Sequence, residues 1–198
     1  ITVQGFGQDL ETDRPDQTES SNTVPKGTLQ IESGLGIQIA QNGLTGLNDG
    51  SFVLPTSLFR IALANKFELR VVNTLRCNRS ENIFFNTVGN WEIDDLQLGF
   101  KWKWVEGDGA KPQISLMSHA VLPTGSGNVD NMYGIVNKLL LSHDFSNGWG
   151  LGYNFGYEYL GIGDGNLTYS ISFAMPITDK LGTYIESYGV YENIENFV

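Results

Sequence analysis

The sequence predicts an all-β protein, an antiparallel up-and-down β-barrel whose apolar side chains face outward. In the segment Trp149–Tyr159 every second residue is large and apolar or aromatic, and the residues between them are small or polar. Such a period of two is typical of a β-strand with one apolar face. The 24 glycines and the aromatic content of 12% indicate many turns and many flat side chains, as in antiparallel β-proteins.

The length of these strands favours a transmembrane barrel over a soluble β-sandwich. Strands of globular proteins usually run to about five or six residues, whereas Trp149–Tyr159 alternates over its whole length. At roughly 3.3 Å per residue and a tilt near 40°, a strand of about ten residues spans about 25 Å, the height of the apolar band of an outer-membrane barrel. A soluble secreted β-sandwich or a lipocalin-like binding protein, with the apolar face inward, remains an alternative.

Nine strands are expected from the alternation. They are predicted at Thr28–Ile39, Ser51–Leu63, Glu68–Arg76, Asp95–Val105, Gln113–Leu122, about Gly134–Asp144, Trp149–Tyr159, Leu167–Met175 and about Gly182–Tyr191. Pro55 disturbs the first half of the second strand, and Leu140 breaks the alternation of the sixth. We expect a long loop at Cys77–Asp94 and a tight hairpin turn at Ser146-Asn147-Gly148.

The lengths of the connections and the positions of the aromatic residues are those expected of a bacterial membrane barrel. Connections after the first, third, fifth and seventh strands are longer than the others, as in bacterial barrels with short periplasmic turns and longer extracellular loops. Aromatic residues of the apolar face gather near the strand ends, where amphipathic rings occupy the two membrane–water interfaces. On the side of the short turns these are Phe67, Trp102, Trp104, Phe145 and Trp149, and on the side of the long loops Tyr157, Tyr159 and Tyr169.

The opposite face of the predicted strands carries charges of both signs. Its charged residues are Glu32, Arg60, Arg70, Lys101, Lys103, Glu158 and Glu186, and His119 lies on the same face. A Lys or Arg directed at lipid would cost about 2–4 kcal/mol at the membrane midplane, so we expect these residues to face an enclosed polar lumen. They can serve as salt-bridged packing of the lumen, or as a lining that selects and binds a small solute.

Residues 1–26 form a polar N-terminal segment, and residues 27–198 form the barrel domain. The acidic stretch Asp13–Glu19 contains the candidate residues Asp13, Arg14, Asp16 and Glu19. It is either a flexible leader or a segment that folds back into the barrel, where Arg14 and the acids pair with the lumen charges. The sequence leaves both possibilities open.

Several pieces of the chain resemble a known family. They are TDRPDQTES at Thr12–Ser20 followed by Val24-Pro25-Lys26-Gly27, and then SLFRIALANKFELRV, LQLGFKWKW, LLLSHDFSNGWGLGYNFGYEY and ITDKLGTYIESYG. Together they resemble the outer-membrane transporter family named after the MetA pathway of phenol degradation. The resemblance implies a bacterial outer-membrane barrel with a periplasmic N-terminus. It also implies about 12 strands, so that this sequence would lack the last strands.

The function expected from these observations is passive and non-enzymatic. We expect a channel or transporter-like protein for small solutes, hydrophobic or aromatic ones included; the alternative is a plugged, structural barrel subunit of a larger outer-membrane assembly. The expected partners are outer-membrane lipid, a small-molecule solute and an envelope protein complex, whereas the net charge of −10 argues against nucleic acid. We expect no cofactor, metal site or catalytic group, because two histidines and one cysteine show no ligand or triad spacing.

Overall fold

The computed structural model describes residues 12–13, 17–41, 48–81, 87–126, 132–161, 163–178 and 181–192. Ten β-strands occupy most of these residues: β1 (Leu29–Gln41), β2 (Asn48–Ala64), β3 (Phe67–Glu81), β4 (Thr87–Ile93), β5 (Leu96–Val105), β6 (Gln113–Leu122), β7 (Gly134–Asp144), β8 (Gly150–Tyr159), β9 (Asn166–Thr178) and β10 (Leu181–Tyr191). Across these ranges there is no helical segment with the length and hydrophobicity of a membrane span.

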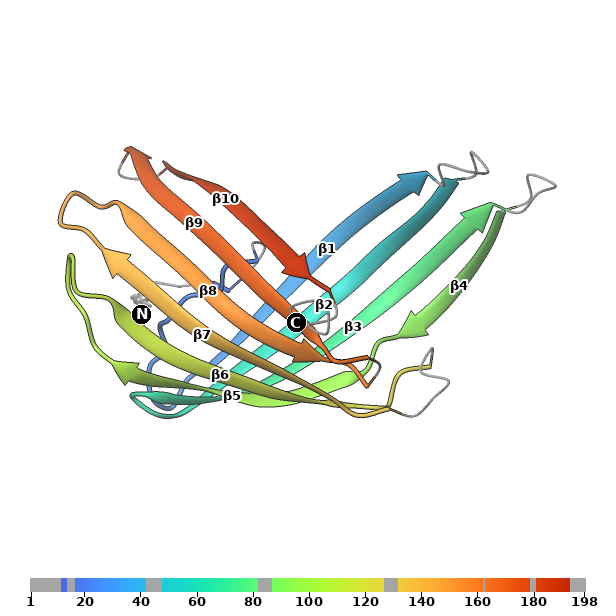
Figure 1. Cartoon of the computed structure of the whole chain (residues 1–198), viewed down its shortest axis with the longest axis horizontal. Helices are drawn as coiled ribbons and strands as arrows, with labels where there is room; N and C mark the ends of the chain where they lie inside the picture. Colours follow the sequence, from blue (N-terminus) through green and yellow to red (C-terminus); the bar gives the residue numbers. More distant parts are fainter. Residues whose placement is uncertain are drawn as a thin grey trace, which may run out of the picture.

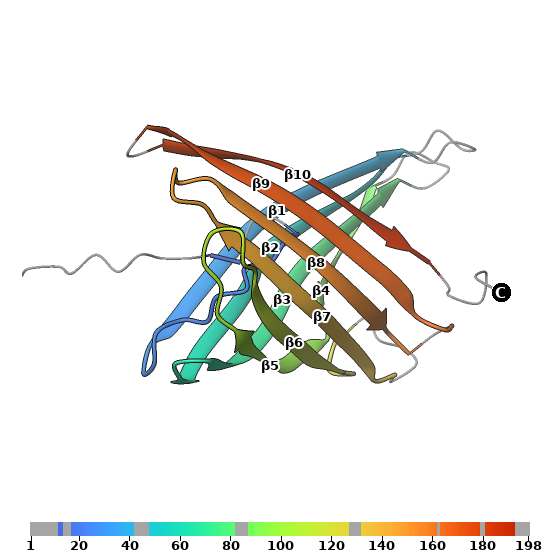
Figure 2. The ribbon, with the colours of Figure 1, turned by 60° about the vertical axis from the view of Figure 1, so that its left-hand side comes forward.

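The strands form one strongly curved antiparallel sheet. Its order is β1-β2-β3-β5-β6-β7-β8-β9-β10, so each strand on this path pairs with the next one, and β4 lies off the path and pairs with β3 (Figure 1). Figure 2 shows how the sheet bends round until β9 and β10 lie across from β1 and β2. The predicted all-β, antiparallel up-and-down fold is therefore confirmed. β1 and β10 are the two ends of the strand order, and the described residues contain no pairing between them.

The prediction of a long loop at Cys77–Asp94 was wrong. β3 continues to Glu81 and pairs with β4 from Leu75↔Ile93 to Glu81↔Thr87, while its first half, from Phe67 to Val72, pairs with β5. β4 and β5 together therefore make one crossing beside β3, interrupted at Asp94-Asp95, where Arg76 binds Asp94 at 3.0 Å. The ten strands correspond to the nine predicted crossings. The loop prediction failed because polar residues predominate in this hairpin and hide its alternation.

Local breaks in the strands have simple chemical causes. The β1–β2 register shifts between Gly34 and Gly36, opposite a second shift in β2 between Val53 and Thr56. Pro55, which has no N–H to donate, lies within this irregular stretch, as its chemistry requires. The predicted hairpin turn between β7 and β8 is also present, with Gly148 at φ 82° donating its N–H to the carbonyl of Phe145 at 2.9 Å.

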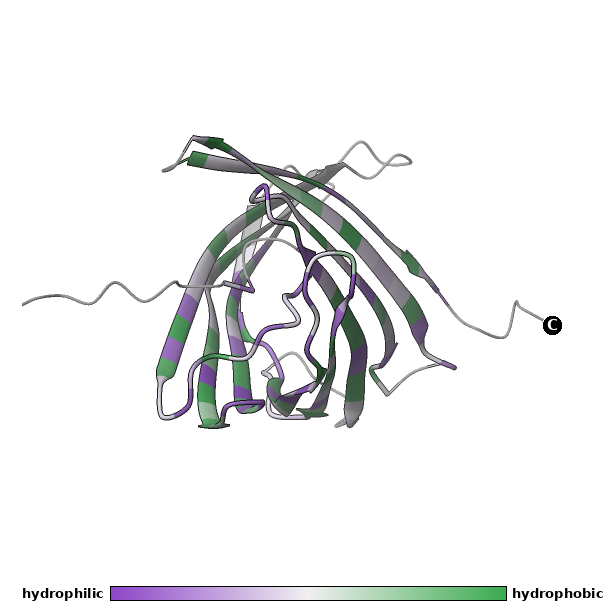
Figure 3. Ribbon diagram, turned by 90° about the vertical axis from the view of Figure 1, so that its left-hand side faces the viewer, coloured by the Kyte–Doolittle hydropathy of each residue, from purple (hydrophilic) through white to green (hydrophobic). Residues whose placement is uncertain are grey.

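Apolar side chains cover the outside of the curve and polar ones fill its inside. Among the described residues, 29 large hydrophobic side chains are exposed, whereas only 7 hydrophobic ones are buried alongside 13 polar or charged ones. Phe155 is 57% exposed and Lys101 is 0% exposed. Figure 3 shows the resulting alternation of hydrophobic and hydrophilic residues along the strands. The predicted direction of the two faces is confirmed.

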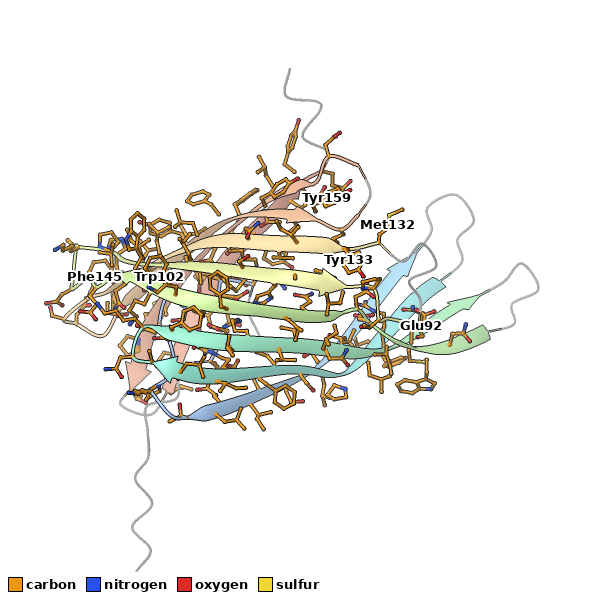
Figure 4. The ribbon with its side chains drawn as sticks, turned by 90° about the horizontal axis from the view of Figure 1, so that it is seen from below. Glu92, Trp102, Met132, Tyr133, Phe145 and Tyr159 are labelled. Carbon is orange, nitrogen blue, oxygen red and sulfur yellow. The ribbon has the colours of Figure 1, made fainter. Side chains whose placement is uncertain are left out.

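The aromatic residues lie at both ends of the outer face. Trp102 and Phe145 lie at one end of the sheet, and Tyr133 and Tyr159 toward the other (Figure 4). Trp102, Trp104, Trp149 and Tyr169 are exposed, while Phe67, Phe145, Tyr157 and Tyr159 are half-buried. The two predicted groups of rings therefore sit at opposite ends of the strands.

Leu140 fits this arrangement although it breaks the apolar pattern of β7. It is fully buried on the inner face and packs with Met117, Val121 and Val136. These four residues form a small apolar cluster inside a mainly polar interior. One exception to the alternation is thus explained by contact between two neighbouring strands, β6 and β7.

Candidate functional site

The N-terminal segment lies inside the curve of the sheet. Figure 3 shows residues that precede β1 crossing the concave side. Asp13, Thr18, Ser21 and Val24 are buried there, and backbone contact with β2 begins where Gly27 donates its N–H to the carbonyl of Ala62 at 3.0 Å. Of the two possibilities that the sequence left open, the folded-back segment is the one observed for residues 12–13 and 17–26. Arg14 and Asp16 lie outside the described residues.

Asp13 is the centre of the contacts between this segment and the sheet. Its Oδ2 accepts hydrogen bonds from Lys101 Nζ and from Arg70 Nη1, each at 2.7 Å, and lies 3.3 Å from Arg60 Nη1. Its Oδ1 accepts the N–H of Ser20 at 2.9 Å. One carboxylate therefore meets three cations from the adjacent strands β2, β3 and β5.

Two glutamates of the sheet complete the pairing of Arg60. Glu68 accepts from Arg60 Nε at 2.9 Å and from Arg70 Nη1 at 2.9 Å, and it is fully buried. Glu32 accepts from Arg60 Nη1 at 3.1 Å and from the N–H of Asp13 at 2.9 Å. Both guanidinium groups are thus held by several charge-assisted hydrogen bonds, the strongest class available to a buried arginine.

A second acid of the segment, Glu19, connects β3 with β7. Its carboxylate accepts from Arg70 Nη2 at 2.7 Å and from Lys138 Nζ at 3.3 Å. Arg70 Nε donates to His119 Nε2 at 3.2 Å, and His119 Nδ1 lies 3.1 Å from Gln97 Oε1. Arg70 and Gln97 therefore occupy the two ring nitrogens of His119.

The backbone of the segment is fixed at further points around the sheet. Glu186 of β10 accepts the N–H of Thr18 at 2.6 Å and its hydroxyl at 2.7 Å. Glu68 accepts the N–H of Val24 at 2.9 Å. Lys103 Nζ donates to Asn22 Oδ1, and Ser115 Oγ donates to the carbonyl of Ser21. These contacts reach strands on both sides of the curve.

The charges of the segment match those of the sheet. The ion-paired cluster contains four cations from the sheet, Arg60, Arg70, Lys101 and Lys138, and two anions from the sheet, Glu32 and Glu68. The sheet thus contributes four minus two, or two excess positive charges. Asp13 and Glu19 supply two negative charges, so the cluster is neutral only with the segment in place.

Electrostatics keep both acids of the segment ionised. Burial alone would raise the pKa of Asp13, but Lys101, Arg70 and Arg60 outweigh it and hold that pKa well below its usual range. Burial likewise opposes ionisation of Glu19, yet Arg70 and Lys138 lower its pKa to about 2. The ion pairs therefore persist throughout the physiological pH range.

The interior keeps some open space beside the segment. A cavity of about 300 Å³ is lined by residues that include Asp13, Glu19, Arg70, His119 and Glu158. Within the described ranges no group of three or more His, Cys, Asp or Glu residues could hold a metal ion. The lining combines these charged and imidazole groups with apolar side chains such as Leu58 and Met117.

The structure brings most of the predicted lumen residues together. Glu32, Arg60, Arg70, Lys101 and His119 join Asp13 and Glu19 in one buried cluster, as the contacts above show. Lys103, Glu158 and Glu186 lie on the same inner face but outside that cluster. All eight predicted lumen residues therefore point inward.

Sequence reasoning left out residues that the cluster needs. Glu68 and Lys138 lie on the polar faces of their predicted strands but were not assigned to the site. The two-residue spacing from Glu68 to Arg70 already places both on one face, so this signal was available. Asn154 and Ser170, also buried on the inner face, give no charge signal and were missed.

The family can now be assigned. A family model described as "Putative MetA-pathway of phenol degradation" matches residues 12–197. The chain belongs to this family. No curated protein and no solved structure matches the sequence. The match begins at Thr12, so it includes the segment that carries Asp13 and Glu19 as well as the whole sheet, and the resemblance of the sequence to this family is confirmed.

Proposed function

We propose that this protein is an outer-membrane β-barrel that passes small solutes passively, without catalysis, and that its N-terminal segment acts as a plug. One observation carries the proposal: the segment occupies the interior through ion pairs and hydrogen bonds and leaves a charged cavity of about 300 Å³ beside it. Polar contacts can be exchanged with water and solute during passage, whereas an apolar core in this position would close the interior permanently.

The outer face supports the membrane location. The exposed side chains of the strands include Leu35, Ile37, Phe100, Phe155 and Ile171. Exposed apolar surface of this extent marks contact with lipid or with another protein. The aromatic residues at both ends of the strands fit the two interfaces of a bilayer (Figure 4). The same arrangement argues against a soluble binding protein, which would bury these residues.

A reversible lock on the plug tests the proposal. A Cβ atom placed at Gly152 would lie 3.2 Å from Cγ2 of Thr18, which is close enough for a disulfide between cysteines at the two positions. The test variant is Thr18→Cys/Gly152→Cys in a Cys77→Ser background, and Cys77→Ser alone is the control. Conductance is recorded in planar bilayers before and after a reductant is added.

The three possible results separate the candidate functions. The proposal expects conductance in the control, no conductance in the oxidised variant, and its recovery on reduction. Conductance that persists in the oxidised variant would show that the segment does not control passage. Absence of conductance in every sample would favour the second candidate function, a plugged structural subunit of an envelope assembly, which is supported by the fully buried ion pairs of Arg60 and Glu68.

A further inference from the structure

A second, smaller cavity lies on the inner face of β8, β9 and β10. Its volume is about 140 Å³, and its lining includes Lys138, Asn154, Glu158, Ser170 and Tyr188. Asn154 lies directly opposite Ser170 in the β8–β9 ladder, and Ser170 lies opposite Tyr188 in the β9–β10 ladder. A row of polar side chains therefore crosses three strands.

Two side chains of this row are buried without hydrogen-bond partners. Asn154 is 3% exposed and Ser170 is 7% exposed. Neither Nδ2 and Oδ1 of Asn154 nor Oγ of Ser170 has a partner among the described residues. Buried polar groups are nearly always hydrogen-bonded, because burial without a partner is costly. Both residues line the cavity, so its wall contains polar groups whose hydrogen-bonding capacity is unused.

The charged residues of this cavity favour a ligand that donates hydrogen bonds. Lys138 Nζ already pairs with Glu19 at 3.3 Å, whereas the Glu158 carboxylate has no ion pair or side-chain hydrogen bond within the described part of the chain. An unpaired carboxylate accepts hydrogen bonds, whereas Asn154 and Ser170 can both donate and accept them. The site as a whole suits a ligand with several groups that also donate and accept.

Gly156 sets the shape of the neighbouring surface. A Cβ atom there would lie 2.3 Å from Thr168 Oγ1 and 3.0 Å from Lys138 Cγ. Because glycine has no side chain, Lys138 of β7 and Thr168 of β9 approach each other across β8. Both residues line the cavity, and Gln17, Lys138 and Glu158 also line the 300 Å³ cavity beside it. The two cavities thus share one wall.

We propose that this site binds a small polyhydroxylated solute of monosaccharide size. A cavity of about 150 Å³ holds a molecule the size of benzene, so the space of about 140 Å³ admits the six-membered ring, and the substituents of the ring extend into the 300 Å³ cavity that shares its wall. Hydroxyl groups on the ring donate to Glu158 and both donate to and accept from Asn154 and Ser170. The proposal builds on the proposed passage of solutes and names their chemical class.

Saturation-transfer NMR on the full chain in detergent micelles tests this binding, with D-glucose as the probe and tetrahydropyran, the same ring without hydroxyls, as the comparison solute. The site variant is Asn154→Leu/Ser170→Ala, which keeps approximate shape and removes the polar atoms. The matched control is Asn137→Leu/Ser187→Ala, which makes the same substitutions in β7 and β10 on the face away from the cavity. We expect glucose affinity to fall about tenfold or more in the site variant and to stay unchanged in the control.

Two further readouts separate binding from structure and from transport. The thermal midpoint of the site variant should be no lower than that of the wild type, because the removed groups have no protein partners to lose. Equal glucose signals from both variants, or an equally strong signal from tetrahydropyran, would overturn the proposal. Binding is measured in micelles and passage in bilayers, so loss of conductance with intact binding would reject the channel and leave this site standing.

Discussion

The substitution Asp13→Asn gives the sharpest test of how the N-terminal segment is held. It keeps the size of the side chain and removes one charge from a cluster in which Asp13 meets Lys101, Arg70 and Arg60 at 2.7, 2.7 and 3.3 Å. The amide oxygen of Asn can still accept a hydrogen bond. It cannot balance the cations, so the interior is left with one uncompensated positive charge.

The burial of the cluster sets the size of the expected effect. The side chains of Asp13 and Lys101 are 1% and 0% exposed, so solvent cannot screen the loss. Removing one partner of a buried ion pair typically destabilises a protein by about 3–5 kcal/mol, because the remaining charge stays buried. We expect a loss in this range. Asp108→Asn, the same substitution at an exposed residue of the β5–β6 turn, should change the stability by less than about 0.5 kcal/mol.

Two assays follow the loss. Urea unfolding in detergent micelles, monitored by tryptophan fluorescence, measures the change in stability. Hydrogen exchange of residues 12–26 measures release of the segment, because the N–H groups of Asp13, Thr18, Ser20 and Val24 all donate to buried or half-buried carboxylates. In Asp13→Asn these amides should exchange faster while the amides of β6 and β7 remain protected.

A double substitution decides whether charge is the cause. Adding Lys101→Met to Asp13→Asn removes a cation that has lost its partner, so it should restore at least about 1 kcal/mol of stability. Identical unfolding midpoints and identical exchange rates for Asp13→Asn and Asp108→Asn would refute the reasoning. A double variant less stable than the sum of both single changes would refute the charge explanation in particular.

Three further predictions follow from single positions. Gly99→Ala should destabilise the protein by about 1–3 kcal/mol in urea unfolding, because its Cβ would lie 2.0 Å from His119 Cδ2, whereas Gly36→Ala, with its nearest contact at 3.7 Å, should not. Glu19 should contribute stability that is fully present above its ordinary pKa of 4.5 and is lost as the pH falls toward about 2, so the exchange protection factors of residues 17–24, taken relative to the intrinsic rate at each pH, should be constant from pH 7 to 5 and fall below 4.5. Phe155→Arg should cost about 2–4 kcal/mol in a bilayer, whereas a negligible cost would contradict the membrane-facing assignment.

The strands and their faces could be predicted because a period of two is a local signal. Any stretch of six or more residues with alternating large apolar and polar side chains, such as Leu96–Val105, predicts a β-strand and shows which residues share its apolar face. The signal disappears where polar residues fill both faces, as at Asn78–Glu81. It is also misleading where an apolar residue packs inside, as Leu140 does against Met117.

The contacts of the site were less predictable because they depend on strand register. Arg60 pairs directly with Arg70 in the β2–β3 ladder, and Glu68 pairs with Lys101 in the β3–β5 ladder. A shift of one residue in either ladder would move these side chains to the outer face. The sequence shows which residues share a face, but only the assembled sheet shows which charges become neighbours.

The register also explains why the sheet needs its N-terminal segment. Two arginines directly opposite each other repel, and Arg60 and Arg70 do so in a buried interior with Lys101 close by. Glu32 and Glu68 balance only two of the four cations in the cluster. Without the segment, the other two positive charges would need water or other groups as partners. Asp13 and Glu19 supply these partners, although Asp13 lies 88 residues before Lys101 in the sequence and Glu19 lies 119 residues before Lys138. The acidic motif near the N-terminus is therefore the electrostatic counterpart of the cations inside the curved sheet, and the movement of the segment that we propose would require these cations to find other partners, whether water or a passing solute.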